Sequence, residues 1–153
     1  MDNKEFKNLF NKLAKQYGFK AISNNWFRES DECIVGINLQ KSYYSNLYYL
    51  NINIFVHGIF GNHDIKEKDL MIKGTNSFSE RSPKEYDDIF SLEMQMDDKE
   101  RTQRFESFFA EYLGPLVEKA LTRNGIKELV HANQISVFPS AKEELNEKFQ
   151  LGV

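Results

Sequence analysis

Two consecutive stretches of alternating apolar and polar residues constrain the fold more than any other feature of this 153-residue sequence. Residues 33–40 and 48–57 each place apolar side chains at every second position. This is the period of a strand with one buried face. The segment Tyr43–Asn46 between them has a length that suits a hairpin loop. We therefore expect a β-hairpin at the centre of the fold.

The side chains of the two stretches also predict the register of this hairpin. Pairing Ser42 with Leu47 brings the amide side chains of both strands to one face and the apolar side chains to the other. The facing pairs are then Gln40 with Tyr49, Asn38 with Asn51, and Gly36 with Asn53. A shift by one residue would move every side chain of one strand to the opposite face, so the pattern favours this register.

Amphipathic helices are expected on either side of the strands. Apolar residues recur with helical spacing over residues 3–17, and Asn3 is placed to cap that helix. A longer apolar stripe covers residues 105–121, where Pro115 predicts a kink. Two shorter helices are expected after it.

Further strands are expected at Trp26–Glu29, Ser77–Arg81 and Phe90–Met96. Hairpin-linked strands that are apolar on one face, beside amphipathic helices, are typical of an α+β fold. We predict a single antiparallel sheet of four to five strands, packed on one face by an N-terminal helix and C-terminal helices. The sequence shows no internal repeat and no linker rich in Pro, Gly or Ser, so residues 1–153 are expected to form one domain.

Charge and cysteine content exclude several classes of protein. The 20 Lys and Arg residues against 23 Asp and Glu residues give a net charge of −3, which provides no long-range attraction to nucleic acid. The single cysteine cannot form an internal disulfide. No stretch approaches the roughly 20 apolar residues of a membrane helix, and the charged N-terminal residues do not form a signal peptide. We therefore expect a cytoplasmic protein with no nucleic-acid or membrane partner.

The sequence carries few residues arranged for catalysis. It has no Gly-x-Ser-x-Gly elbow, no glycine-rich phosphate loop and no His-Glu-x-x-His motif. Cys33 lies on the apolar side of its strand, which favours a buried structural cysteine. His57, His63 and Asp64 could together hold a divalent ion, so a metal-dependent or other hydrolase remains an alternative. No catalytic residue and no cofactor are predicted.

The polar face of the expected sheet is the candidate binding surface. Amide side chains both donate and accept hydrogen bonds but do not titrate near neutral pH, so they recognise polar groups without moving protons. Asn is unfavourable in strands, whereas a face that is merely solvated is usually rich in Lys, Glu and Thr. The residues expected on this face or beside it are Asn38, Gln40, Tyr49, Asn51, Asn53, Ser91, Glu93 and Gln95. A face made polar for solubility alone is the alternative.

The segments Gln40-Lys41-Ser42 and Tyr49–Ile54 resemble a family of uncharacterised bacterial proteins, domain of unknown function 4304. Gly18-Phe19 and Phe27-Arg28 fit the same pattern, and Arg81 corresponds to a later arginine. The resemblance covers roughly residues 5–96. It implies a bacterial origin and a shared fold, and it adds Ser42 and Arg81 to the candidate binding surface. It implies no activity.

Together these observations favour a non-catalytic binding module that uses the polar sheet face. The expected partner is another protein or a small polar ligand, and a homodimer with this face as its interface is left open. Some small α+β bacterial proteins neutralise toxins by binding them, which suggests an immunity-like role by analogy alone.

Overall fold

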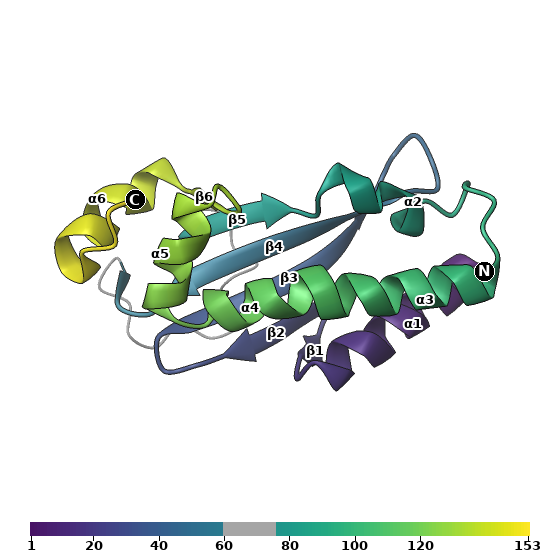
Figure 1. The fold of residues 1–153 in the computed structure, drawn as a ribbon, viewed down its shortest axis with the longest axis horizontal. Helices are drawn as coiled ribbons and strands as arrows, with labels where there is room; N and C mark the ends of the chain where they lie inside the picture. Colours follow the sequence, from purple (N-terminus) through teal and green to yellow (C-terminus); the bar gives the residue numbers. More distant parts are fainter. Residues whose placement is uncertain (60–75) are drawn as a thin grey trace.

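The structure is a computed structural model that describes residues 1–59 and 76–153. Within these residues, six strands form one antiparallel sheet in which every strand pairs with its neighbour in the sequence (Figure 1). The strands are β1 (Lys20–Ile22), β2 (Asn25–Glu29), β3 (Cys33–Lys41), β4 (Tyr48–Val56), β5 (Phe78–Arg81) and β6 (Ser136–Val137). The predicted α+β fold is confirmed. The predicted number of strands is too low, because β1 and β6 are too short to show alternation.

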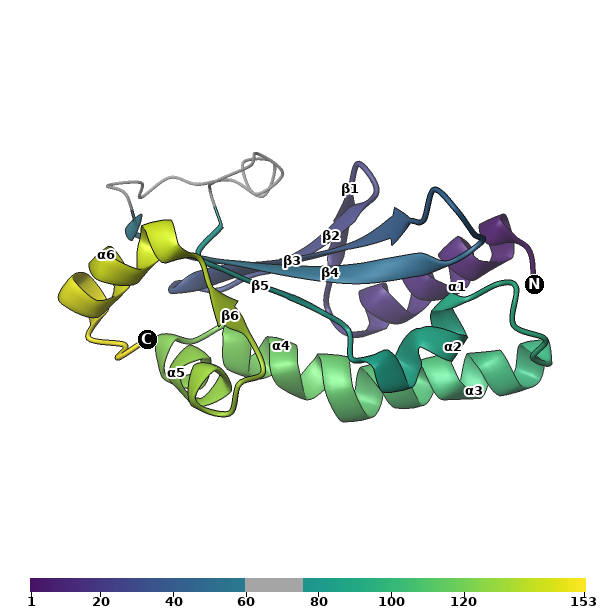
Figure 2. The same cartoon turned by 90° about the horizontal axis from the view of Figure 1, so that it is seen from above.

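Most of the helices lie on one side of the sheet, whereas the last helix of the chain lies at one end of it (Figure 2). The helices are α1 (Asn3–Gln16), α2 (Asp87–Phe90), α3 (Asp98–Phe108), α4 (Gly114–Ala120), α5 (Arg123–His131) and α6 (Pro139–Phe149). Figure 2 shows α1, α3, α4 and α5 on the same side of the strands, as expected for N-terminal and C-terminal helices that cover one face. None of the helices in the described residues has the length and apolar content needed to cross a membrane.

The long C-terminal helix differs from the prediction at its centre. A π-helical segment at Phe109–Leu113 joins α3 to α4, and Pro115 lies in the first turn of α4. The wider π-helical turn just before Pro115 accommodates a residue that has no backbone N–H to donate to the preceding turn. The two helices therefore continue as one rod along the sheet instead of separating at a sharp kink (Figure 1).

The start of α1 also differs from the prediction. The N-cap is Asp2 and not Asn3: Asp2 Oδ1 accepts a hydrogen bond from the backbone N–H of Glu5 at 2.8 Å. Glu5 Oε2 accepts from the backbone N–H of Asp2 at 3.1 Å, which completes a capping box. Asn3 is thus free to contact the β3–β4 hairpin, where its amide nitrogen donates to Asn46 Oδ1 at 3.1 Å and to the Tyr48 hydroxyl at 3.0 Å.

The central hairpin has the predicted register. The structure pairs Gly36 with Asn53, Asn38 with Asn51, and Gln40 with Tyr49. The backbone N–H of Ser42 donates to the carbonyl of Leu47 at 2.8 Å, which closes the loop where the pattern placed it. The apolar side chains of the alternation form the face that the helices cover, as predicted. They are fully buried: Val35, Ile37, Leu50, Ile52 and Ile54.

The opposite face of the sheet is divided into two halves. Near the start of β3 and the end of β4 it carries Ile34 and Phe55, which are buried, and Phe27 of β2 is buried beside them. Toward the hairpin loop the same face carries the amide side chains, which are half-buried or exposed. The polar surface predicted from the sequence is therefore confined to the half of the face next to the loop.

The strand predicted at Phe90–Met96 is wrong. Residues 87–90 form α2, and of the residues that follow only Ser91 makes an isolated bridge, to Leu47. The guanidinium of the buried Arg101 donates to the carbonyls of Asp88, Ile89 and Met94, which draws this segment around the side chain. The apolar residues of this alternation do not form a strand face: Phe90, Leu92 and Met96 pack on the core from a helix and a loop, whereas Met94 is exposed.

Candidate functional site

Five polar or aromatic side chains from β3, β4 and β5 meet on the polar half of the sheet face. The strand pairing brings Asn38, Asn51 and Arg81 into one row across the sheet and places Gln40 beside Tyr49 in the next row. All of them are half-buried or exposed. We call these five residues the amide–arginine network.

Hydrogen bonds join the network across all three strands. Asn51 Nδ2 donates to Asn38 Oδ1 at 3.1 Å and to Gln40 Oε1 at 3.0 Å. Arg81 Nε donates to Asn51 Oδ1 at 3.1 Å, and Arg81 Nη2 donates to Gln40 Oε1 at 3.3 Å. Because Gln40 and Asn51 are each held by two or more partners, the network fixes the orientation of side chains that would otherwise rotate in solvent.

The ring of Tyr49 packs against the guanidinium of Arg81, the cation of this network. The guanidinium carbon of Arg81 lies 4.6 Å from the centre of the Tyr49 ring. A guanidinium at this distance is attracted to the ring face, and at an exposed site the interaction contributes about 0.5–1 kcal/mol. Arg81 is thus held by hydrogen bonds along one edge and by a ring on one face.

A groove of about 980 Å³ lies beside the network. Gln40, Asn51 and Arg81 line it, so the network forms part of its wall. The remaining lining residues are Ile52, Asn53, Ser79, Glu80, Ser136 and Phe138. The groove therefore presents amide, hydroxyl and guanidinium groups, a composition suited to a polar ligand.

The structure places most of the predicted binding residues in or beside this site, but not all of them. Asn38, Gln40, Tyr49, Asn51 and Arg81 form the network, and Asn53 lines the groove. Ser42 lies at the loop, where its Oγ accepts from the backbone N–H of Tyr44 at 3.2 Å.

The predicted placement of Glu93 and Gln95 on the sheet face is wrong, because no strand forms at 90–96. Glu93 Oε1 instead accepts from the backbone N–H of Asn46 at 2.9 Å and so fastens the hairpin loop. Gln95 is exposed in the loop before α3.

The groove residues that the sequence did not predict are Ile52, Ser79, Glu80, Ser136 and Phe138. Ser79 and Ser136 pair with each other across β5 and β6, strands of four and two residues. Strands this short carry no readable alternation, so the faces of their side chains follow only from the pairing. The pairing of β5 with β4 places Ser79 opposite Asn53, on the polar face, and this pairing is the signal that would have indicated Ser79.

The titratable residues predicted for chemistry show no catalytic arrangement within residues 1–59 and 76–153. Cys33 is fully buried, and this burial raises the pKa of its thiol to about 12, so it is a neutral structural residue as expected. His57 Nε2 lies 3.2 Å from Glu29 Oε1. No group of three His, Cys, Asp or Glu that could hold a metal occurs in this part of the chain. His63 and Asp64 lie outside the described residues.

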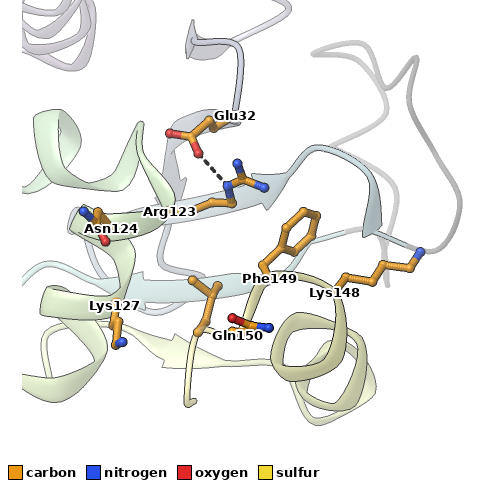
Figure 3. A pocket seen from close by; sticks show the side chains of 8 residues that line it. Glu32, Arg123, Asn124, Lys127, Lys148, Phe149 and Gln150 are labelled. Carbon is orange, nitrogen blue, oxygen red and sulfur yellow. Dashed lines mark hydrogen bonds and ion pairs between the residues drawn. The ribbon is translucent and has the colours of Figure 1, made fainter.

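A second pocket, of about 490 Å³, lies between α5 and α6 (Figure 3). Arg123 Nε donates to Glu32 Oε2 at 2.5 Å, and its guanidinium lies 4.8 Å from the centre of the Phe149 ring. Lys148 points away from Arg123 in Figure 3 and donates to the carbonyl of Gly58 at 3.3 Å. The cations of this pocket are therefore partly satisfied by the protein itself. Sequence reasoning missed the pocket because Glu32 and Arg123 are 91 residues apart.

Comparison with known proteins places the site in a family. A family model described as "Domain of unknown function (DUF4304)" matches residues 10–119, a range that contains the whole amide–arginine network. No curated protein and no solved structure matches the chain.

Proposed function

This chain belongs to the family described as domain of unknown function 4304, and we propose that it is a non-catalytic binding module that acts through the amide–arginine network and the adjoining groove. The observation that carries the proposal is the position of Arg81. Its guanidinium is held by two amide oxygens and a tyrosine ring on the polar sheet face, at the wall of a groove. A cation positioned in this way offers donors to a ligand.

The chemistry of the network supports binding more than catalysis. Amides and guanidinium groups keep their protonation states near neutral pH, so they can orient a ligand but are poor general acids and bases. Their mutual hydrogen bonds also reduce the side-chain entropy that a ligand would otherwise remove on binding. The network is therefore suited to recognising polar groups with a surface that is already ordered.

The β3–β4 loop extends this surface toward a larger partner. Tyr43 is 96% exposed and Tyr44 is 98% exposed, and the loop that carries them is fastened by Asn46 to both Asn3 and Glu93. Exposed tyrosines on an anchored loop are common in protein-binding surfaces, because they supply a large contact area with few rotatable bonds. We propose that a protein partner would contact this loop and the groove together, whereas a small polar ligand would occupy the groove alone.

Affinity capture tests the proposal. The immobilised protein is incubated with the cytoplasmic fraction of its native host, since one unpaired cysteine leads us to propose that it acts in a reducing compartment. Gln40→Ala/Asn51→Ala/Asn53→Ala removes three amides from the site, and Asn124→Ala/Lys127→Ala changes polar residues of the α5–α6 pocket as a control. Bound proteins and small molecules are identified by mass spectrometry, and thermal unfolding verifies that each variant folds.

We expect one species to be retained by the wild type and the control but lost with the amide variant. A second copy of this chain in that role would make the face a dimer interface, and a toxin would make the module immunity-like. A species retained equally by the amide variant, or no retained species at all, would contradict the proposal.

A further inference from the structure

We infer that the amide–arginine network binds a carboxylate group of the ligand, held end-on by the guanidinium of Arg81. This inference rests on the proposed function, because it assigns a ligand chemistry to the same site. It follows from which hydrogen-bond donors of Arg81 the protein uses and which it leaves unused.

The protein occupies one edge of the guanidinium and leaves the other edge without a partner. Nε and Nη2 share one edge, and these atoms donate to Asn51 Oδ1 and Gln40 Oε1 at 3.1 and 3.3 Å. Nη1 and the second hydrogen of Nη2 form the other edge, for which residues 1–59 and 76–153 supply no acceptor. Two parallel N–H groups at such an edge match the two oxygens of a carboxylate.

The charge of Arg81 is also uncompensated in the described part of the chain. Arg28 and Arg123 lie 2.7 and 2.5 Å from the carboxylates of Glu118 and Glu32, and Arg104 pairs with Asp88. Arg81 makes no ion pair within residues 1–59 and 76–153; its acceptors there are neutral amides. The groove wall therefore presents a positioned positive charge that an anionic ligand group would neutralise.

Gln40 adds a second donor next to this free edge. Its Oε1 accepts from both Asn51 and Arg81, which fixes the plane of the amide. Its Nε2 donates to no acceptor among the described residues and so remains available to a ligand. The hydroxyls of Ser79 and Ser136 line the same groove and add neutral donors.

Glu80 is also among the residues that line the groove, but its side chain lies on the face of β5 opposite that of Arg81, because Glu80 pairs with the buried Ile52. Its Oε1 accepts from the backbone N–H of Arg81 at 2.9 Å. Its charge therefore does not neutralise the free edge of the guanidinium. Glu80→Gln, which keeps an acceptor for that N–H, should change the affinity for a carboxylate much less than Arg81→Lys does.

The experiment is a titration of the full chain followed by ¹⁵N NMR of side-chain signals. The probes are glutarate, a blocked Ala-Glu-Ala peptide and inorganic phosphate, which represent a small-molecule carboxylate, a protein carboxylate and a non-planar anion. We expect saturable shifts of the Arg81 Nε–Hε signal and the Gln40 amide signal with at least one carboxylate. Arg81→Lys keeps the charge but loses the two-donor edge, and should weaken binding about 10-fold or more.

Lys127→Gln is the control variant, because it removes a cation from the α5–α6 pocket and not from the groove. It should leave the affinity unchanged. Binding of glutarate alone assigns a small-molecule ligand, and binding of the peptide assigns an acidic side chain of a protein; either supports the inference. The inference is overturned by equal affinity for phosphate, by wild-type affinity in Arg81→Lys, or by absence of saturable shifts with both carboxylates. If Arg81→Lys still captures the partner of the wild type, the proposed function stands and the carboxylate assignment fails.

Discussion

Asn51 and Arg81 face each other across β4 and β5, and Arg81 Nε donates to Asn51 Oδ1 at 3.1 Å. Asn51 uses its amide nitrogen for Asn38 and Gln40 of β3 at the same time. One side chain thus links three strands and sets the position of the only charged group in the network. Substitutions at Asn51 therefore change the groups that hold the Arg81 guanidinium and leave the guanidinium itself in the protein.

Asn51→Asp should abolish binding of a carboxylate while leaving the fold intact. The new carboxylate would pair with Arg81 and neutralise it internally, so the affinity for the carboxylate probe should fall at least about 10-fold. The free energy of unfolding should fall by about 1–2 kcal/mol, because the variant loses the two hydrogen bonds that Asn51 Nδ2 donates at a partly exposed site. Titration and urea unfolding of the same sample measure both effects. Wild-type affinity in Asn51→Asp would contradict this account.

The contact between Tyr49 and Arg81 should appear as a measurable coupling. Tyr49→Leu, Arg81→Met and the double variant form a double-mutant cycle in urea unfolding. We expect a coupling of about 0.5–1 kcal/mol, the value of a cation–π contact at an exposed site. Strictly additive effects would mean that the ring does not hold the guanidinium.

Arg101→Met should strongly lower the free energy of unfolding and leave the residues that line the groove unchanged. Arg101 is 2% exposed and donates to the carbonyls of Asp88, Ile89 and Met94. Its loss would leave buried acceptors without donors, which costs about 2–4 kcal/mol. Urea unfolding measures this loss, and hydrogen exchange should show faster opening of residues 91–96.

Arg104→Met is the matched control on the same helix. Arg104 pairs with Asp88 at a partly exposed position, where an ion pair contributes about 1 kcal/mol or less. The two variants should therefore differ by more than about 1 kcal/mol. Equal losses would show that the three carbonyl contacts of Arg101 do not hold the segment before α3.

The Cys33 thiol should be unreactive in the native protein. Burial, with a smaller contribution from the nearby Glu32, raises its pKa from 9.0 to about 12. The neutral thiol therefore favours the folded state fully below about pH 9, and this contribution is lost as the pH rises toward 12. Labelling with a thiol reagent at pH 8 should proceed at the rate of unfolding and accelerate in urea. Rapid labelling in the absence of urea would contradict the burial of this residue.

The sequence predicted the β3–β4 hairpin correctly, because its alternating pattern is compatible with only one register. Over 33–56 the alternation is long, and only one register places Asn38 beside Asn51 and Gln40 beside Tyr49. The alternation alone therefore predicts the positions of four of the five network residues, namely Asn38, Gln40, Tyr49 and Asn51. Arg81 came from the resemblance to domain of unknown function 4304, because the four-residue β5 has no pattern of its own to show which face it presents.

The errors occur where a tertiary contact overrides a local pattern. The alternation at 90–96 has the period of a strand, but Arg101 binds the carbonyls of Ile89 and Met94, and Leu92 and Met96 pack on the core from a loop. No local rule predicts that a distant guanidinium will be buried there. Pro115 is a different case, because local structure accommodates it: the π-helical segment at Phe109–Leu113 precedes the proline and the helix continues.

The most direct test of the central claim is the side-chain NMR spectrum of the full chain, recorded with and without the species that it captures. The account predicts that the largest changes occur at the Arg81 Nε–Hε signal and at the amide signals of Gln40 and Asn51, with smaller changes at Tyr43 and Tyr44. Changes confined to the α5–α6 pocket, at Asn124 and Lys127, would show that the sheet face is merely solvated and would contradict the account.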